Sequence, residues 1–378
     1  MNSRKSRPSQ LRLLTEITCP NCWFVTKPDE LLWVSTHSDL LSDPRLGEDE
    51  PQRFLPTRYS IRGNALDTRH NECFDLACPN CHLQVPRHLL ELPLHITSIF
   101  GSRSSGKTVY LAALTHQLRQ SLPLDFQISF QDTDPGSNIR IRQNEAMLFD
   151  SKEPDVPAMI DDIIEKTELR GAERGLNLVR RVHFGNDVRE FPQPFMFTLQ
   201  LNNGHYKRDK RADFGRVLCL YDNAGESFRP DHETAGQTDH LARSKMLLFT
   251  FDPTQDPRLQ RLIRDVSPGR LPTEFYQEPQ EPLLNEAAKR IRLKAGLGIR
   301  EKIGAPLIVV VTKFDIWSEV IDGIDRTATP WRQVRIPGSD GQDEQVCMAI
   351  DRPMVEIMSG RVRQLLLQTS PEIVAAAD

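Results

Sequence analysis

Apolar runs of strand length alternate with segments of helical spacing over residues 93–378. Two of these segments, 109–118 and 284–295, place apolar side chains three and four residues apart, which indicates helices with one face in a core. The strand-like runs indicate strands of a buried, mostly parallel sheet, and they are 94–100, 217–221, 246–252 and 306–311. The alternation predicts an α/β fold.

Further elements are predicted between and after these runs. The segment 194–201 has alternating character and is predicted to pair with 214–221 as an antiparallel hairpin around Asn202-Asn203-Gly204. Residues 134–190 are predicted to be an insertion, and no strand is predicted after Asp315. The remaining predictions are a short strand at 125–130 and helices at 137–149, 158–169, 354–368 and 369–378.

The stretch Gly101-Ser-Arg-Ser-Ser-Gly106-Lys107-Thr108 lies between a predicted strand and a predicted helix. In that setting successive backbone N–H groups and a helix N-terminus point at one spot, which suits a polyphosphate. Lys107 would reach the outer phosphates, and the Thr108 hydroxyl would bind Mg²⁺. The sequence therefore predicts a phosphate-binding loop that consists of Gly101, Ser102, Ser104, Ser105, Gly106, Lys107 and Thr108.

Two more predicted strands end in polar motifs. The run 217–221 is followed by Asp222-Asn-Ala-Gly225, where the Asp222 carboxylate can hold the Mg²⁺ shell and the Gly225 N–H can face the γ-phosphate. The run 306–311 is followed by Thr312-Lys313-Phe-Asp315. A carboxylate at Asp315 can accept hydrogen bonds from the guanine N1–H and amine, and the wrong base would leave it unpaired. The Lys313 stem would lie along the base.

Two identical C-x-x-C segments, Cys19-Pro-Asn-Cys22 and Cys78-Pro-Asn-Cys81, predict a metal site. Four thiolates in two such pairs are the ligand set of a structural tetrahedral Zn²⁺ site. The alternatives are a thioredoxin-like redox pair or unrelated cysteines, although a redox motif normally occurs once. The 55 residues between the pairs exceed what a simple ribbon needs. We therefore expect an insertion at 27–72 within a small zinc-ribbon module at 1–92.

The other cysteines carry weaker predictions. Cys73 lies close enough along the chain to be a substitute ligand, and so does His82. Cys219 falls inside a predicted core strand, where a free cysteine behaves as a small buried hydrophobe. Cys347 is interpreted in the same way.

The motifs at 101–108, 222–225 and 312–315 resemble those of the translation-factor/Ras-like (TRAFAC) class of P-loop GTPases, over roughly residues 93–378. The resemblance implies a P-loop NTPase three-layer sandwich with GTP and Mg²⁺ as ligands. The usual base motif is N-K-x-D, and Thr312 in place of Asn is a variant of dynamin-like and signal-recognition GTPases. No S-A-K-like element follows to complete the guanine pocket. With a zinc ribbon ahead of it, the chain is also similar to the double-GTPases of bacterial conflict systems, which implies a second GTPase subunit among its partners.

The resemblance also points to residues for catalysis at the γ-phosphate. Glu226 stands where Ras-like enzymes usually carry a Gln that orients the attacking water; it either positions a water or is a surface residue. Arg103, at the third loop position, either clamps the γ-phosphate with its charge or points to solvent. Together with Lys107 these are the catalytic candidates. The candidates for the switch I threonine that binds Mg²⁺ are Thr133, ahead of Thr167 and Thr198.

Composition limits the partners and the location. The 378 residues carry a formal net charge of −4, which gives no general attraction to nucleic acid or anionic membrane. The segment 205–213 is locally basic, but such a run usually decorates a solvated hairpin. No apolar run approaches the ~18 residues that span a bilayer, and the N-terminus lacks an apolar signal core. We expect a cytoplasmic protein.

Three functions stay open from the sequence alone. The leading hypothesis is a GTP-binding, GTP-hydrolysing switch whose nucleotide state changes which effector protein it holds. A scaffold that binds GTP without turnover is the first alternative, favoured by Glu226 and by the missing S-A-K-like element, and phosphate release separates the two. The second alternative is a zinc-dependent nucleic-acid or protein docking module regulated by nucleotide, which salt-dependent binding of nucleic acid would favour.

Overall fold

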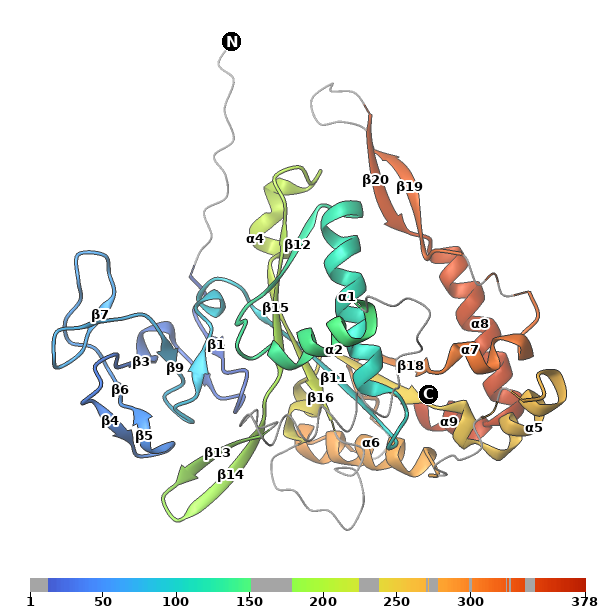
Figure 1. The fold of residues 1–378 in the computed structure, drawn as a ribbon, viewed down its shortest axis with the longest axis horizontal. Coiled ribbons are helices and arrows are strands. Elements are labelled where there is room, and N and C mark those ends of the chain that lie inside the picture. The colour runs from blue at the N-terminus through green and yellow to red at the C-terminus, as the bar shows by residue number, and fades with distance from the viewer. Residues whose placement is uncertain are drawn as a thin grey trace.

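The computed structural model describes residues 13–150, 179–223, 238–269, 271, 278–298, 301–323, 325, 328–336 and 344–378. They form a mixed α/β fold in which a six-stranded sheet runs through the body of the molecule (Figure 1). Some sequence predictions lie outside the described residues, namely Gly225, Glu226, Thr167 and the helix at 158–169.

The strand order in this sheet is β12-β15-β16-β11-β17-β18. Four neighbouring strands, β16, β11, β17 and β18, run parallel, whereas β15 is antiparallel to β16 and to β12. The predicted pairing of 194–201 with 214–221 is confirmed, although residues 202–215 connect the two strands in place of a tight turn. The strand bounds are β11 Leu94–Gly101, β12 Ile128–Asp132, β15 Phe195–Leu201, β16 Arg216–Asp222, β17 Met246–Phe251 and β18 Leu307–Val311.

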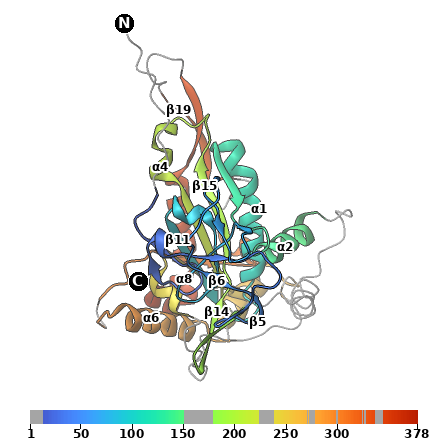
Figure 2. The same cartoon turned by 90° about the vertical axis from the view of Figure 1, so that its left-hand side faces the viewer.

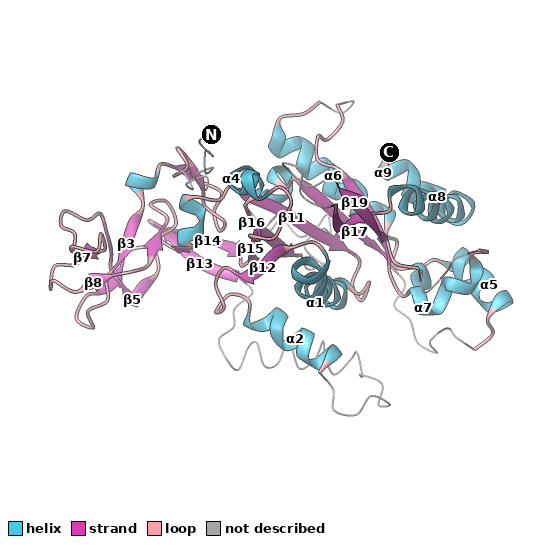
Figure 3. Cartoon of the chain, turned by 90° about the horizontal axis from the view of Figure 1, so that it is seen from above, coloured by secondary structure: helices cyan, strands magenta, loops and turns pink. Residues whose placement is uncertain are grey.

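Helices cover both faces of the sheet, because successive side chains of each strand point to opposite faces and both faces are apolar. Ile99 belongs to a buried cluster with Leu111 of α1, and the next residue, Phe100, belongs to a second cluster with Leu284 of α6. Figure 3 shows α1 and α2 on one face and α6 on the other. The helices are α1 Lys107–Asp125, α2 Ile139–Phe149, α4 Arg211–Phe214, α5 Pro257–Val266, α6 Glu281–Ala295, α7 Phe314–Trp317, α8 Arg352–Thr369 and α9 Pro371–Ala377.

The helices predicted at 137–149, 354–368 and 369–378 are confirmed as α2, α8 and α9. The prediction that no strand follows Asp315 is wrong, because β19 (Trp331–Ile336) and β20 (Gln345–Ile350) form an antiparallel hairpin. These strands pair with each other and do not extend the main sheet. β19 mixes apolar and charged residues, so its pattern alone does not distinguish it from a polar loop, whereas β20 contains the apolar run 346–350, which the sequence analysis did not recognise as a strand. A second hairpin, β13 (Val179–Phe184) with β14 (Asp187–Pro192), also projects from the body (Figure 1).

The N-terminal region is built from short antiparallel strands. A four-stranded sheet has the order β10-β9-β3-β6, and three two-stranded ribbons surround it. One buried cluster joins Ile17 and Trp23 of this region to Ile96 of β11 and Val217 of β16, so the small sheet and the large sheet share a core. Figure 2 shows this region end on, with α1 and α2 to one side and α6 to the other. The strands are β1 Ile17–Thr18, β2 Val25–Thr26, β3 Leu32–Val34, β4 Leu41–Asp43, β5 Gly47–Pro51, β6 Arg53–Phe54, β7 Ala65–Leu66, β8 Glu72–Cys73, β9 Leu76–Ala77 and β10 Gln84–Val85.

Candidate functional site

The four predicted metal ligands lie together. The sulfur atoms of Cys19, Cys22, Cys78 and Cys81 all lie within 4.8 Å of one another. Cys19 Sγ is 3.8 Å from Cys81 Sγ, and Cys22 Sγ is 3.6 Å from Cys78 Sγ. Four thiolates around a tetrahedral ion with Zn–S bonds of about 2.3 Å would have sulfur atoms about 3.8 Å apart. The cluster, to which we refer as the four-cysteine centre, could therefore hold a metal such as zinc.

Two equivalent turns bring the cysteines together. The first turn joins β1 to β2 and the second joins β9 to β10. The residue after each pair, Trp23 or His82, has a left-handed backbone (φ 58° and 61°), and its N–H donates to the carbonyl of the first cysteine. Within each turn a backbone N–H also donates to a sulfur atom, from Asn21 to Cys19 and from Asn80 to Cys78, at 3.4 Å in both cases. Such donors stabilise thiolates.

The thiols of the centre differ in acidity because they crowd a buried space. Burial raises the pKa of the Cys19 thiol well above its usual range. Hydrogen bonding from the Cys19 thiol holds the pKa of Cys22 far below its usual range, and a hydrogen bond from Asn80 acts in the same direction. Hydrogen bonds to sulfur favour the thiolate, the form that binds metal.

The two predicted substitute ligands make other contacts. The Cys73 thiol lies 4.0 Å from Asp67 Oδ2, and His82 Nδ1 lies 2.8 Å from Asp43 Oδ2. Neither residue belongs to the four-cysteine centre. Cys219 is fully buried in β16, as predicted, and burial raises the pKa of its thiol. Cys347 is only partly buried.

The loop 101–106 connects β11 to α1, as predicted, and lies against β17. A Cβ on Gly101 would lie 2.2 Å from Thr250 Oγ1, so only glycine allows this close approach. The Ser105 hydroxyl is 2.8 Å from the same Thr250 oxygen. Gly106 has a left-handed backbone (φ 83°), and α1 begins at the next residue.

Lys107 is buried within the loop, with 9% of its surface exposed. Its Nζ donates to the carbonyl oxygens of Gly101 at 3.1 Å and Ser102 at 2.6 Å. Burial lowers the pKa of the Lys107 ammonium, and the carboxylates of Asp222 and Glu278 oppose this shift. The Lys107 amine is therefore held by two carbonyl oxygens of the loop, and a ligand would have to replace these hydrogen bonds.

The structure brings together the two residues predicted to bind Mg²⁺, because Thr108 Oγ1 donates to Asp222 Oδ2 at 3.1 Å. Arg140 of α2, which the sequence analysis missed, lies 3.9 Å from the same carboxylate oxygen. Burial lowers the pKa of Arg140, and Asp222 opposes the shift. Arg140 also lies over the Phe195 ring at 4.9 Å, so two contacts fix its position.

The outer side of the loop contacts residues that the sequence analysis also missed. The Arg103 N–H donates to Glu278 Oε2 at 3.3 Å, and the Ser102 hydroxyl donates to Gln280 Oε1 at 3.3 Å. Gln255 Nε2 donates to the Arg103 carbonyl at 2.9 Å. The side chains of Arg103 and Ser104 are exposed. A carboxylate thus accepts from a backbone N–H of the predicted phosphate-binding loop.

The motif 312–315 follows β18 and lies beside the loop, since a Cβ on Gly106 would be 3.9 Å from Thr312 Cβ. Lys313 has a left-handed backbone (φ 55°), and its Nζ pairs with the buried Asp252 carboxylate at 2.6 Å. The Trp317 indole N–H donates to the Thr312 carbonyl at 2.7 Å, which fixes the start of α7. Asp315 lies in the first turn of α7 and is exposed.

The described candidates for the switch I threonine lie directly after β12 and within β15, toward the β12 edge of the sheet. The Thr133 N–H donates to the Met196 carbonyl at 3.0 Å, and its hydroxyl is buried without a hydrogen bond to the part of the chain that the structure describes. The Thr198 hydroxyl donates to the Gln131 carbonyl within the β12–β15 pair. Among the described residues, the side-chain contacts of Asp222 are with Thr108 and Arg140 and not with either of these threonines.

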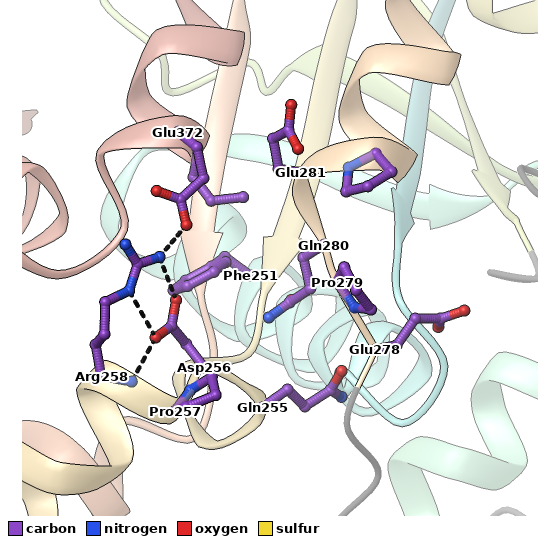
Figure 4. A pocket seen from close by; sticks show the side chains of 12 residues that line it. Phe251, Gln255, Asp256, Pro257, Arg258, Glu278, Pro279, Gln280, Glu281 and Glu372 are labelled. Atoms are coloured by element: carbon purple, nitrogen blue, oxygen red, sulfur yellow. Dashed lines mark hydrogen bonds and ion pairs between the residues drawn. The ribbon is translucent and has the colours of Figure 1, made fainter.

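A cavity of about 430 Å³ adjoins the loop (Figure 4). Glu278, Gln280 and Gln255, which contact the loop, form part of its wall. Arg258 lies at its edge between the carboxylates of Asp256 and Glu372. None of the described residues that were predicted to bind nucleotide or metal lines this cavity.

Among the described residues, no helix has the length and apolar character needed to cross a membrane. Comparison with curated proteins finds a similarity to the "Putative ESX-1 scaffolding and assembly protein SaeC" of Mycolicibacterium smegmatis, with 23% identity over 310 residues. The match covers 79% of this chain and 66% of the relative, so the chain spans slightly less than two thirds of the relative's length. No protein-family model matches the chain. No solved structure matches it.

Proposed function

We propose that this protein is a GTP-binding, GTP-hydrolysing switch that controls the assembly of a protein complex. The observation that supports this most strongly is the convergence of Lys107, Thr108 and Asp222 where β11 and β16 end, with Thr312 beside Gly106. Ligands of open α/β sheets bind at the carboxyl ends of parallel strands. The fold proposed for this site is the P-loop NTPase sandwich, with four parallel strands and helices on both faces.

The chain offers a role for each group at this site. Lys107 would exchange the Gly101 and Ser102 carbonyls for phosphate oxygens. Thr108 and Asp222 would hold Mg²⁺, which supplies charge to the phosphates, and Gly225 would face the γ-phosphate. Asp315 and Lys313 would select guanine. Hydrolysis would be in-line attack of water on the γ-phosphorus, which breaks its bond to the bridging oxygen and releases GDP and phosphate, with Glu226 and Arg103 as the candidates that assist.

The proposal of an assembly role comes from the relative, whose name describes scaffolding and assembly. The same name favours a second candidate, a scaffold that binds GTP without turnover. Both candidates use the same nucleotide site and differ only in phosphate release. For the four-cysteine centre we propose Zn²⁺, held by Cys19, Cys22, Cys78 and Cys81 as a structural ion.

Replacement of Lys107 tests the site directly. Lys107→Ala removes the buried ammonium, and we expect Mg²⁺–GTP to bind at least about 100-fold more weakly in calorimetric titration, as for loss of charge-assisted hydrogen bonds. Lys289→Ala, at an exposed lysine of α6 that pairs with Glu286, is the matched control and should bind as the wild type does. Equal affinity in Lys107→Ala and wild type would refute the site.

A further inference from the structure

A buried hydrogen-bonded contact joins the first cysteine turn to the end of β16. The Tyr221 hydroxyl donates to the Pro20 carbonyl and accepts from the Trp23 indole N–H, the latter at 2.8 Å. Pro20 lies between Cys19 and Cys22, and Trp23 follows Cys22 directly. Tyr221 is 1% exposed, so no solvent replaces either partner. The cysteine turn therefore supplies two hydrogen bonds to the hydroxyl of a tyrosine that directly precedes Asp222.

The contact continues from Tyr221 to His240. The two rings stack with centroids 4.2 Å apart and planes 3° from parallel, and His240 is fully buried. His240 Nε2 lies 2.9 Å from Asn223 Oδ1, while Asn223 Nδ2 donates to the Ile99 carbonyl at 2.8 Å. Because the amide nitrogen faces Ile99, its oxygen faces His240, so Nε2 carries the proton and donates.

This series of contacts ends at Asn223 and Ile99, which lie at the ends of β16 and β11. Asn223 directly follows Asp222, and Ile99 lies two residues before Gly101. The Asn223 backbone N–H also donates to the Ile99 carbonyl, at 3.2 Å. His240 is held on its other side by Ser98, whose Oγ is 2.8 Å from Nδ1. A buried polar group that loses its hydrogen-bond partner costs free energy. The position of each residue in this series therefore favours one position of the residue that it contacts.

We propose that Trp23, Tyr221 and His240 are positioning residues, through which the four-cysteine centre with its metal fixes the Asp222–Asn223 end of β16 for Mg²⁺-dependent nucleotide binding. The nucleotide half of this proposal rests on the proposed function. The other half, the coupling of the four-cysteine centre to the end of β16, requires only that the metal hold the turn that carries Pro20 and Trp23. If that turn moves, the Tyr221 hydroxyl loses two partners inside the core, and the stacked His240 loses its support.

The test uses variants of the full chain whose metal content is measured. Trp23→Phe removes the indole donor and keeps an aromatic ring. Trp33→Phe is the matched control, since Trp33 lies in the same region but contacts Tyr59 and Arg87. The readout is hydrogen–deuterium exchange of the Asn223 amide, which does not depend on nucleotide. With metal retained, exchange should rise about fivefold in Trp23→Phe, as for loss of one buried hydrogen bond, and should stay at the wild-type rate in Trp33→Phe.

Two further variants keep the test decisive. Tyr221→Phe removes the hydroxyl from the other side of the contact and should give a similar rise, which covers the case that Trp23→Phe loses its metal. Cys22→Ser, which should lose the metal, is expected to raise Asn223 exchange at least as much. If exchange is unchanged in Tyr221→Phe and in Cys22→Ser, the coupling is refuted.

The nucleotide arm separates the two proposals. The ratio of GTP affinity with Mg²⁺ to that with EDTA should fall about fivefold in Tyr221→Phe relative to wild type. If exchange rises but the wild type binds no GTP, the coupling stands and the proposed function fails. If the wild type shows Mg²⁺-dependent GTP binding that Tyr221→Phe leaves unchanged, the proposed function stands and the positioning role is refuted.

Discussion

The four-cysteine centre and the loop 101–108 differ in how their polar groups are engaged. In the centre, four sulfur atoms lie within 4.8 Å of one another, and those of Cys19 and Cys78 already accept hydrogen bonds from backbone N–H groups, so a metal needs only to replace protons. In the loop, Lys107 donates to carbonyls of its own loop, and the Arg103 N–H donates to Glu278. There a ligand has to replace internal hydrogen bonds.

The difference suggests different roles for the two regions. A site whose ligands are assembled in advance is suited to a permanent, structural ion. A site whose charged groups bond to one another changes those contacts whenever its ligand binds or leaves, and this is the requirement for a switch. In this chain the contacts that would change include those of Glu278 and Asp222, on segments far apart in the sequence.

The largest effect is expected for the four-cysteine centre. Cys78→Ser removes one of four ligands, and because metal binding and folding of such a small unit are coupled, the N-terminal region should lose its metal and its resistance to protease. Metal analysis and limited proteolysis are the measurements. Cys347→Ser, at a partly buried cysteine on β20 outside the centre, should keep both properties. A Cys78→Ser protein with full protease resistance would contradict the structural role.

A smaller effect, on choice of base, is expected at Asp315. Asp315→Asn should weaken GTP binding about 100-fold and favour xanthosine triphosphate, because the amide can donate to the xanthine O2 where the carboxylate accepted from the guanine amine. Competition assays with both nucleotides give the answer. Asp322→Asn, at an exposed acid of the following loop, is the control, and a shared preference in both variants would count against guanine recognition by Asp315.

The smallest effect is expected at Glu278, whose carboxylate accepts from the Arg103 N–H and lies close enough to raise the pKa of Lys107. Glu278→Gln removes a negative charge that competes with phosphate, so GTP should bind about threefold more tightly at low ionic strength. Glu281→Gln, three residues along the same segment, where the carboxylate accepts from Asn285, should leave the affinity unchanged. Weaker binding in Glu278→Gln would show that Glu278 supports the ligand.

The parts of the fold that the sequence predicted depend on local patterns. The buried strands and α1, α2 and α8 follow from runs of apolar residues at strand or helix spacing, which each segment carries in itself. β19 could not be predicted in this way, since Arg332 and Arg335 interrupt its apolar residues and only pairing with residues 345–350 defines it, whereas the apolar run 346–350 of β20 was a local signal that the prediction missed. The connection at 202–215 does begin with a turn at Asn202-Asn203-Gly204, closed by the His205 N–H to the Asn202 carbonyl, but the short helix α4 follows before β16, and the sequence analysis missed that helix.

The candidate site shows the same limit. The cysteine pairs and the loop 101–108 are contiguous motifs that can be recognised from the sequence, and the predicted cluster of the four cysteines is confirmed. The sequence analysis missed Arg140, Glu278 and His240. Each lies on a segment distant in the sequence that only tertiary packing places beside the site. Of these three residues, only Arg140 could have been found from the sequence, because it lies in a helix that was predicted within the insertion at 134–190. No motif marks Trp23 or Tyr221, although their hydrogen bond joins the two predicted sites.

Calorimetric titration of the wild-type protein with GTP and with ATP, at equal Mg²⁺, tests the central claim most directly. The site built from the loop 101–108, Asp222 and the motif 312–315 predicts one GTP bound per chain and ATP bound at least about 100-fold more weakly, since adenine cannot donate two hydrogen bonds to the Asp315 carboxylate as guanine can. Equal affinity for the two nucleotides would contradict guanine recognition. No binding of either nucleotide would contradict the assignment of the loop.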